Sequence, residues 1–425
     1  MPEAIRAYGG AMPRRNRPAR PSASPDGQPI PVELERFVAG GLALGREGGG
    51  RVVLAEGGLP GESVLVVPAV DKATLVRGSV VRLDHPAPGR VSPPCAEVAA
   101  GCGGCDLQHA GLELQRELKV EVVRDALARI GRLRDVKIAP GEHLPGDSYR
   151  TVLRCAVEGD RAGLRRRRSN EVHVLDGCLV AHGAIERVLV EARFPGAEQV
   201  TIRVGARTAD ALVVVEPSAR GCVVPVGTSI VGADELDAGA QVHIHELVGR
   251  RRLRISARSF FQARPDGAEA LVRAVSRALG GFDPRSGRLA DLYGGVGLFS
   301  AVLGATDGVL VERSESAASD AEHNLRETGT RVVRRAVEDW DPEPVDAVVA
   351  DPSRAGLGSV AADVVAATGA AQIALVSCDP AALARDARLL VDRGYAVRGV
   401  ELVDMFPHTH HIEAVTTLVL DRPPT

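Results

Sequence analysis

The chain has 425 residues, of which 45% are hydrophobic and 25% are charged, a composition typical of a globular protein with two to four domains. The formal net charge of −3 excludes a basic field around the whole molecule, so contacts with nucleic acid require a local patch. The sequence has neither a long apolar run nor a signal-peptide core, which predicts a cytoplasmic protein with no membrane segment. Seven unevenly spaced cysteines favour metal binding or catalysis over disulfide bonds.

The N-terminal part divides into a tail and a β-rich segment. Residues 1–28 are rich in Arg, Pro, Ala and Gly without an apolar period, which predicts a disordered basic tail. Residues 29–88 contain short β-rich runs separated by glycine, the pattern of a small barrel. The expected strands cover residues 32–38, 51–54, 63–70 and 73–84. This segment resembles a TRAM domain, which is an OB-like RNA-binding barrel.

A cysteine motif follows the barrel. Cys95, Cys102 and Cys105 are spaced as C-x6-C-x2-C, and the glycines beside them let the backbone wrap closely around a metal cluster. A four-iron cluster takes four thiolates, and the candidates for the fourth are Cys155, Cys178 and Cys222. A structural zinc is the alternative, and the spacing favours iron–sulfur over zinc.

Residues 89–252 are expected to form a central α+β domain. Residues 107–130 have helical periodicity and good helix formers, and many short strands are expected after them. Four consecutive arginines stand at residues 165–168, next to a turn. They favour either a clamp for RNA phosphates or a solvated turn, and the sequence does not decide between the two.

The third domain, residues 253–425, reads as a Rossmann-like α/β fold. An apolar strand at residues 288–292 runs into a glycine loop and then a helix, which is the opening β-loop-α unit of that fold. Glu312 ends the next strand, where a carboxylate can accept hydrogen bonds from ribose hydroxyls. Further strands are expected at residues 331–335, 345–350, 372–376, 395–402 and 414–420.

Cys378 stands at the carboxyl end of a predicted buried strand, where an open α/β sheet binds its ligands. A thiol at this place can be a nucleophile, while a small buried core residue is the alternative. The ends of the first, second and fourth strands of this domain also carry polar residues, Asp351 among them, and the segment 404–413 with Glu413 lies between the last two strands. This convergence on one rim predicts a functional site.

From about residue 29 to residue 420 the chain resembles the RNA uracil-5-methyltransferases, in the branch with a TRAM domain and an iron–sulfur cluster. The resemblance is carried by Phe-Phe-Gln at 260–262, Asp-Leu-Tyr-x-Gly-x-Gly at 291–297, Asp-Pro-x-Arg-x-Gly at 351–356, Ser-Cys-x-Pro at 377–380 and Asp-Met-Phe-Pro-x-Thr-x-His-x-Glu at 404–413. It implies a class I methyltransferase domain after a TRAM barrel and a central domain.

The resemblance also implies the chemistry. Methyl transfer from S-adenosylmethionine to C5 of a flipped-out uridine in ribosomal or transfer RNA is expected, with Cys378 as nucleophile and Glu413 as base. A monomer without an obligate protein partner is expected. By resemblance, the residues that contact S-adenosylmethionine are Gln262, Tyr293, Glu312 and Asp351, and the ligands of a 4Fe-4S cluster are Cys95, Cys102, Cys105 and Cys178.

Four positions depart from the family pattern. The family usually has Cys at Gly294, Pro at Ser353 and Asn at Asp379, and often a polar residue at Leu298. None of the four removes a reacting group. A carboxylate at Asp379 is expected to raise the pKa of the neighbouring Cys378 thiol and oppose thiolate formation.

Two rival hypotheses remain at this stage. An amino-group methyltransferase would use Asp351-Pro352 to hold an exocyclic amine and would not need Cys378. A non-catalytic RNA-binding iron–sulfur protein would need neither Cys378 nor Glu413. The histidines of the last motif, His408, His410 and His411, are expected to be structural or RNA-facing rather than metal ligands.

Overall fold

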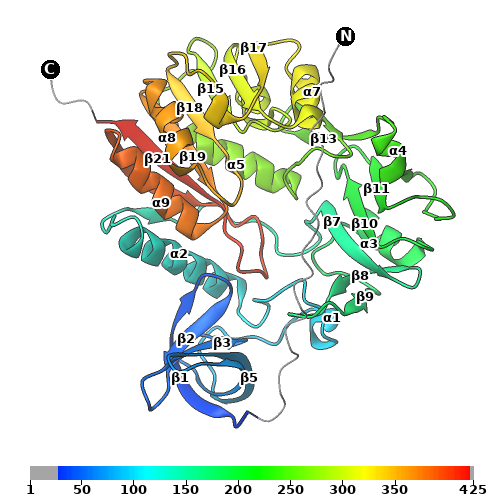
Figure 1. The fold of residues 1–425 in the computed structure, drawn as a ribbon, viewed down its shortest axis with the longest axis vertical. Coiled ribbons are helices and arrows are strands. Elements are labelled where there is room, and N and C mark those ends of the chain that lie inside the picture. The colour runs from blue at the N-terminus through cyan, green and yellow to red at the C-terminus, as the bar shows by residue number, and fades with distance from the viewer. Residues whose placement is uncertain (1–26, 422–425) are drawn as a thin grey trace, which may run out of the picture.

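The computed structural model describes residues 27–421. Figure 1 shows three parts: an N-terminal barrel in blue, a central sheet in green and a C-terminal α/β sheet from yellow to red. The tail predicted for residues 1–28 lies almost entirely outside the described residues.

The N-terminal part is a closed barrel with the strand order β1-β2-β3-β5-β4. Its strands are β1 Ile30–Val38, β2 Leu42–Arg46, β3 Val52–Glu56, β4 Ser63–Asp71 and β5 Leu75–His85. β2 is not among the expected strands, and it contains a glycine, Gly45, a residue that is depleted in strands. Gly45 is a strand glycine under a close backbone approach, since a Cβ there would lie 2.1 Å from the Glu33 carbonyl oxygen.

The central sheet has six strands in the order β12-β11-β10-β7-β8-β9. They are β7 Val152–Glu158, β8 Arg161–Arg165, β9 Val172–Val174, β10 Gln199–Val204, β11 Ala211–Glu216 and β12 Ser229–Gly232. Helix α3, Gly183–Glu191, buries Ile185, Val188 and Leu189 against this sheet. The short helices α1 Ala96–Ala99 and α4 Ala233–Asp237 lie outside the sheet.

The C-terminal sheet has eight strands in the order β17-β16-β15-β18-β19-β21-β20-β6, and β21 alone runs antiparallel to its neighbours β19 and β20. The strands contributed by the last third of the chain are β15 Leu289–Leu292, β16 Asp307–Glu312, β17 Gly329–Arg334, β18 Ala347–Ala350, β19 Gln372–Ser377, β20 Tyr395–Leu402 and β21 Ala414–Leu420. Each strand expected from the sequence in this domain is present.

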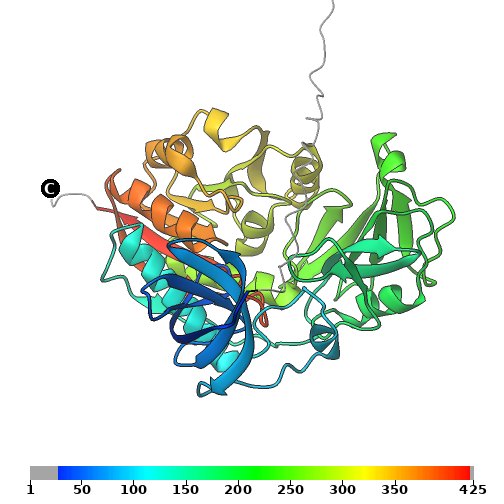
Figure 2. The ribbon, with the colours of Figure 1, turned by 60° about the horizontal axis from the view of Figure 1, so that its bottom comes forward.

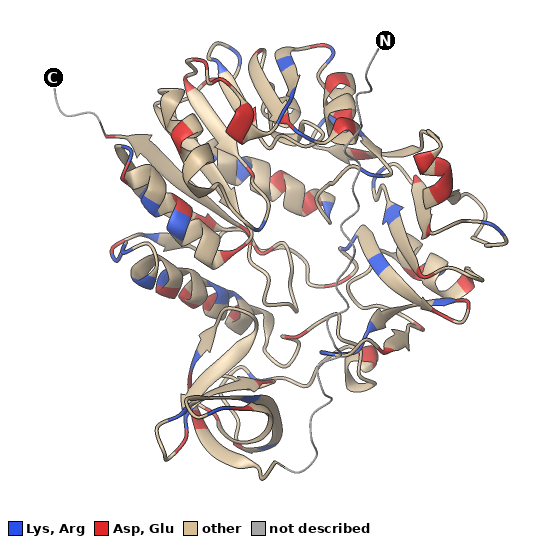
Figure 3. Cartoon of the chain, viewed as in Figure 1, with Lys and Arg blue, Asp and Glu red and all other residues tan. Residues whose placement is uncertain are grey.

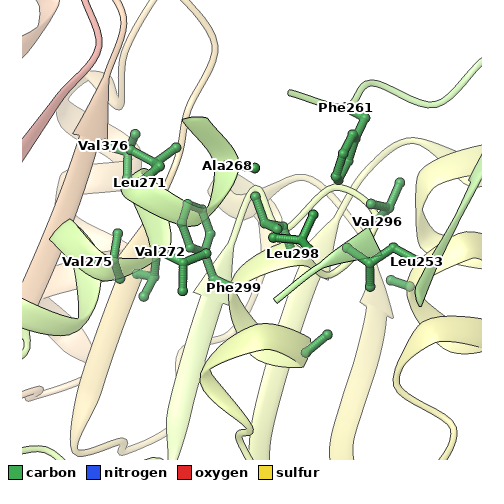
Figure 4. Close-up of a cluster of buried hydrophobic side chains, with 14 of the residues drawn as sticks. Leu253, Phe261, Ala268, Leu271, Val272, Val275, Val296, Leu298, Phe299 and Val376 are labelled. Atoms are coloured by element: carbon green, nitrogen blue, oxygen red, sulfur yellow. The ribbon is translucent and has the colours of Figure 1, made fainter. Parts of the chain in front are cut away.

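Both faces of this sheet are covered, which is why its central strands are almost entirely apolar. Every residue of β15 and of β18 is buried. Helices α5 Pro265–Ala278, α6 Leu298–Leu303 and α7 Glu315–Asn324 contribute to the core on one face, and Figure 4 shows part of that core. Helices α8 Gly358–Ala367 and α9 Pro380–Val391 contribute to the core on the other face, with the 3-10 turn Val337–Asp339.

Two elements of the expected central domain belong physically to the C-terminal sheet. Helix α2, Leu112–Arg129, packs Val123 and Leu127 against Leu383 of α9, and β6, Ile138–Ala139, pairs with β20. The expected division at residue 253 also falls inside a hairpin, β13 His243–Val248 with β14 Arg251–Ser256. Helix α2 and β6 are therefore part of the C-terminal body.

The barrel is held onto this body through α2. Phe37 and Leu59 of the barrel share a buried cluster with Leu118 and Val122 of α2. Figure 2 shows the barrel lying across this helix. In Figure 3, blue and red segments alternate along α2 and α9, so neither helix presents a uniformly basic face in that view. No helix within residues 27–421 combines the length and the apolar character needed to cross a membrane.

Candidate active site

Cys378 and Glu413 lie side by side at one edge of the C-terminal sheet. Cys378 follows the last residue of β19, and Glu413 precedes the first residue of β21. Because these strands are antiparallel, with Ser377 opposite Ala414, the end of one strand meets the start of the other. Asp351 follows β18, the other neighbour of β19. The topology thus gathers the three residues, which the sequence scatters over more than sixty positions.

The groups at this edge influence one another's ionisation. Burial, with Glu413 and Asp351, raises the pKa of Cys378 to about 11, while Arg354 acts in the opposite direction. Burial and then Asp351 raise the pKa of Glu413 well above its ordinary value. The site holds a thiol among acids, with one arginine opposing their charge. Perturbed titratable groups gathered at a ligand-binding rim are typical of an active site.

Arg354 is exposed and takes part in no ion pair with another described residue. The positive charge of Arg354 acts to lower the pKa of Cys378, Glu413 and His411. Its guanidinium therefore lies at the mouth of the site. A free guanidinium there is suited to a phosphate or a carbonyl oxygen.

The expectation that Asp379 raises the pKa of Cys378 is corrected by the structure. Asp379 is the N-cap of α9, and its Oδ1 accepts hydrogen bonds from the backbone N–H groups of Ala381 and Ala382, at 2.9 and 2.8 Å. The carboxylate faces the start of the helix, and it is not among the groups that shift Cys378. Asp and Asn serve equally well as N-caps, which explains why this departure is tolerated.

The glycine loop after β15 has the backbone that a close ligand approach requires. Gly295 and Gly297 have φ of +54° and +87°, and Tyr293 has φ of +58°. The Tyr293 hydroxyl donates to Glu338 at 3.1 Å. The Glu312 carboxylate accepts from the backbone N–H groups of Gly295 and Ser314, which ties the end of β16 to this loop.

Asp291 adds a signal that the sequence did not single out. It is fully buried at the end of β15, and its Oδ2 accepts from both the backbone N–H and the hydroxyl of Ser300. Its Oδ1 has no hydrogen-bond partner within residues 27–421. Burial, with Glu312 adding to it, raises the pKa of Asp291 to about 7. An orphaned buried carboxylate oxygen beside a glycine loop fits a ligand that brings a cation or a donor.

Two further departures have packing explanations. A Cβ at Gly294 would lie 2.4 Å from Cγ of Leu310, so glycine leaves room for the leucine. Leu298 is buried in the core between α5, α6 and the sheet, close to Val296 and Phe299 (Figure 4).

Gln262 is buried in the turn between β14 and α5, next to Phe261, which joins the same core. Nothing in the structure explains Ser353, which is exposed.

The loop that carries Glu413 is held by hydrogen bonds from two side chains of the expected central domain, Lys119 and Tyr149. Figure 1 shows this loop, between β20 and β21, reaching into the middle of the molecule. The buried Lys119 ammonium donates to Asp404 Oδ1 at 2.7 Å and to the Phe406 carbonyl at 3.0 Å. The Tyr149 hydroxyl donates to the Pro407 carbonyl at 3.0 Å. Neither Lys119 nor Tyr149 was expected at the site, because their partners stand more than 250 positions away.

Four cysteines line one cavity of about 180 Å³ between the central sheet and the α1 region. They are Cys95, Cys102, Cys105 and Cys178. Cys155 is buried in the core of the central sheet, and neither it nor Cys222 lines the cavity. The backbone N–H of Gly104 donates to Cys102 Sγ at 3.4 Å. Burial raises the pKa of the Cys102, Cys105 and Cys178 thiols, which a cationic centre in the cavity would offset.

Among residues 27–421, no three His, Cys, Asp or Glu side chains converge tightly enough to hold a single metal ion. A zinc ion draws four ligands onto one centre, whereas each thiolate of a four-iron cluster binds a different iron and stands farther from the others. The donor set of four thiols suits either centre.

Of the four arginines at residues 165–168, Arg165 bonds to Asn170 within its own turn, while the other three contact other parts of the chain. Arg166 donates to the Ala100 carbonyl at 2.8 Å, and Arg167 donates to the Cys105 carbonyl at 2.6 Å. Arg167 and Arg168 also pair with Glu56 of the barrel, at 3.1 and 2.7 Å. Arg167 thus joins the barrel to residues 95–106, which we call the cysteine loop.

The family model described as tRNA (uracil-5-)-methyltransferase matches residues 318–422, which include Asp351, Cys378 and Glu413. An RNA methyltransferase of Streptomyces avermitilis, named as uncharacterized, is 36% identical over 428 residues, covering 92% of this chain and 98% of that protein. The chain belongs to the RNA uracil-5-methyltransferase family. It is an S-adenosylmethionine-dependent enzyme acting on uracil C5 in RNA, so the amino-group methyltransferase and the non-catalytic binding protein are set aside.

Two other members of this family have a named target. The 23S rRNA (uracil(1939)-C(5))-methyltransferase RlmD of Chromohalobacter salexigens is 29% identical over 466 residues, covering 99% of this chain and 94% of that protein. The crystal structure of Pyrococcus abyssi tRNA (uracil-54, C5)-methyltransferase in complex with S-adenosyl-L-homocysteine aligns with a TM-score of 0.68 and 23% identity, covering 91% of this chain and 99% of that chain. That likeness shows the class I methyltransferase fold with its N-terminal barrel and central domain.

Proposed function

We propose that this methyltransferase works through covalent catalysis, with Cys378 as nucleophile and Glu413 as base. The proposal rests on one observation: Cys378 and Glu413 are adjacent where β19 ends and β21 begins. Asp351 follows the neighbouring strand β18, and Arg354 lies at the mouth of the site. Uracil C5 is a weak nucleophile toward a sulfonium methyl group. An enzyme that methylates C5 therefore needs one group to activate the ring and another to restore it.

The steps balance with these two residues and the methyl donor. The Cys378 thiolate adds to C6, and the C5–C6 π electrons move onto the C4 carbonyl oxygen as an enolate. C5 then attacks the methyl group, and the methyl–sulfur bond breaks to leave S-adenosylhomocysteine. The Glu413 carboxylate takes the C5 proton, the C5–C6 double bond re-forms, and the thiolate leaves C6.

The remaining site residues bind and orient. Gln262, Tyr293, Glu312 and Asp351 are assigned to S-adenosylmethionine, and the glycine loop and the orphaned Asp291 oxygen are suited to that ligand. Arg354 is assigned to the uracil edge or its phosphate. Its charge, together with the sulfonium, lowers the pKa of Cys378 when the substrates are bound.

Two substitutions test the chemistry. Cys378→Ala should abolish methylation with S-adenosylmethionine and RNA binding nearly unchanged, because the thiol acts only along the reaction path. Glu413→Gln should accumulate a covalent RNA–protein adduct that carries the methyl group and retains the C5 proton, detectable as a band of reduced mobility. Methylation by Cys378→Ala, or wild-type turnover by Glu413→Gln, would overturn the assignment.

RNA with 5-fluorouridine at the target gives an independent test. Fluorine cannot leave as a proton does, so elimination should stall and trap wild-type enzyme on the RNA. The trapped species should require both Cys378 and S-adenosylmethionine. A trap that forms equally well with Cys378→Ala would point to another nucleophile.

We further propose that Cys95, Cys102, Cys105 and Cys178 hold a 4Fe-4S cluster. Support comes from the cavity that the four cysteines line together. Such a centre would tie the loop after the barrel to the central sheet and would stabilise the fold, as metal sites do. Protein purified anaerobically should be brown with about four irons per chain. Cys155→Ser should leave the metal content unchanged, and stoichiometric zinc without iron would refute the proposal.

The target RNA is proposed to be ribosomal or transfer RNA. The relatives named above act on one or the other. Mapping 5-methyluridine in both RNA pools from a deletion strain and its parent identifies the substrate, since the target nucleotide loses its methyl group only in the deletion strain.

A further inference from the structure

Three segments of the chain meet at one pair of side chains, Asp106 and His410. Asp106 follows Cys105 in the cysteine loop, and His410 lies three residues before Glu413. Asp106 Oδ1 accepts from the His410 backbone N–H at 2.9 Å, and Asp106 Oδ2 is hydrogen-bonded to the His410 ring Nδ1. One carboxylate thus holds both the backbone and the side chain of His410, in the loop between β20 and β21, residues 403–413, which we call the catalytic loop.

The third segment is the turn between β1 and β2 of the barrel. A Cβ at Gly41, whose φ is +76°, would lie 2.9 Å from Asp106 Oδ2 and 3.2 Å from the His410 ring. The barrel therefore closes over the pair so tightly that only glycine fits there. The barrel, the cysteine loop and the catalytic loop touch at this single point.

The backbone next to the pair is strained and is held from both sides. His408 has φ of +68°, a left-handed conformation that costs a non-glycine residue free energy. Its N–H donates to Gln115 Oε1 at 2.6 Å, and its carbonyl accepts from the backbone N–H groups of Asp106 and Leu107 at 3.1 and 2.9 Å. A strained residue persists only when surrounding contacts fix it, and these contacts come from the cysteine loop and α2.

From the pair, contacts continue to the active site. The ring centroids of His410 and His411 are 4.4 Å apart. The charge of Arg354 acts to lower the pKa of His411, which places Arg354 near that ring. Only His411 and Ile412 separate His410 from Glu413. Ile412 is buried against α2 and α9, so the chain between the pair and the base has little freedom to adjust.

We propose that Asp106 and His410 are positioning residues that set the placement of the Glu413 carboxylate by fastening its loop to the cysteine loop and the barrel. The inference rests on the proposed role of Glu413 as the base that acts after methyl transfer. In this proposal the pair takes no direct part in the reaction and acts through the position of Glu413. Loosening the pair slows proton removal from C5 and leaves binding and the earlier steps unaffected.

The test compares Asp106→Ala and His410→Ala with wild-type enzyme on the full chain. Each substitution should lower kcat about 10- to 100-fold, the scale of a small misplacement of a catalytic group, with KM for RNA and S-adenosylmethionine within about twofold. Both variants should accumulate the methylated covalent adduct, because elimination becomes the slow step. Asp106→Asn should restore part of kcat, since its amide oxygen can still accept from the His410 N–H.

The chain contains a matched control. Asp210 Oδ2 accepts from the His245 backbone N–H at 2.7 Å and is bonded to the same histidine's Nδ1 at 3.1 Å, far from the catalytic loop in sequence and on the central sheet's side. Asp210→Ala removes the same kind of contact and should change neither kcat nor the amount of adduct. Thermal unfolding of each variant shows which of them remain folded.

The outcomes separate the two proposals. If Glu413→Gln accumulates the adduct while folded Asp106→Ala and His410→Ala turn over at the wild-type rate, the positioning role is wrong. It is equally wrong if kcat falls without adduct and together with substrate binding, since that marks general damage. If Glu413→Gln itself forms no adduct, the proposed function fails first.

Discussion

Lys119 offers the sharpest test of how the catalytic loop is held. Its side chain is 1% exposed and that of Asp404 is 5% exposed, and their charged atoms lie 2.7 Å apart. Lys119→Met keeps the apolar stem but leaves the Asp404 carboxylate buried without its cation. Removing one partner of a buried ion pair costs about 3–5 kcal/mol, a large part of the stability of a typical domain. The Phe406 carbonyl also loses its donor.

The double variant Lys119→Met/Asp404→Leu separates charge from packing. Replacing a whole buried pair by apolar residues is often neutral or stabilising, so the double variant should recover most of the loss. Urea unfolding of the wild type, both single variants and the double variant, followed by circular dichroism, gives the coupling free energy. A cost below about 1 kcal/mol for Lys119→Met, or a double variant as unstable as the single, would refute the reasoning.

Three further predictions follow from the site. Because burial and two neighbouring carboxyls raise the pKa of Cys378 to about 11, kcat/KM should rise with pH through the neutral and alkaline range, and Arg354→Ala should move the profile to higher pH; a flat profile contradicts this. Gly294→Cys should lower the melting temperature by overpacking worth about 1–3 kcal/mol, and Leu310→Ala in the same chain should restore part of it. Asp379→Asn should leave the methylation rate within about twofold, while Asp379→Ala should cost about 1 kcal/mol; a marked rate change in the Asn variant would show that the carboxylate acts on the thiol.

The C-terminal domain could be predicted from sequence because its signals are local. The strand before Cys378 and the two last strands are apolar runs bounded by polar or turn residues, a pattern that predicts buried strands. The structure has β20 and β21 at the expected bounds. Parallel pairing of β18 with β19 puts Asp351 and Cys378 on one rim, and the antiparallel pairing of β21 with β19 brings the start of β21, with Glu413, to the same rim. Their roles as nucleophile and base remain proposals.

The supporting contacts could not be predicted, because no local pattern records them. Lys119 and Asp404 are 285 positions apart, and Asp106 and His410 are 304 positions apart. A weak signal did exist in α2. Gln115 and Lys119 are one helical turn apart on a face that is otherwise apolar, and polar side chains buried on such a face need partners elsewhere. The missed strand β2 is short and contains Gly45, so its local pattern was too weak to predict a strand.

The catalytic loop owes its shape to parts of the chain that carry no reacting group. Its conformation is set by α2, by the cysteine loop and, through Gly41, by the barrel, and only its two ends belong to the sheet. The same cysteine loop is bound to the barrel by Arg167, which donates to Cys105 and pairs with Glu56. Barrel and base are therefore joined by two routes through one loop. A change that displaces that loop, including any change in what its cysteines bind, acts on the barrel and on the base together. The barrel, the cysteine loop and α2 thus fix the conformation that positions the proposed base, and the methyltransferase sheet alone does not fix that conformation.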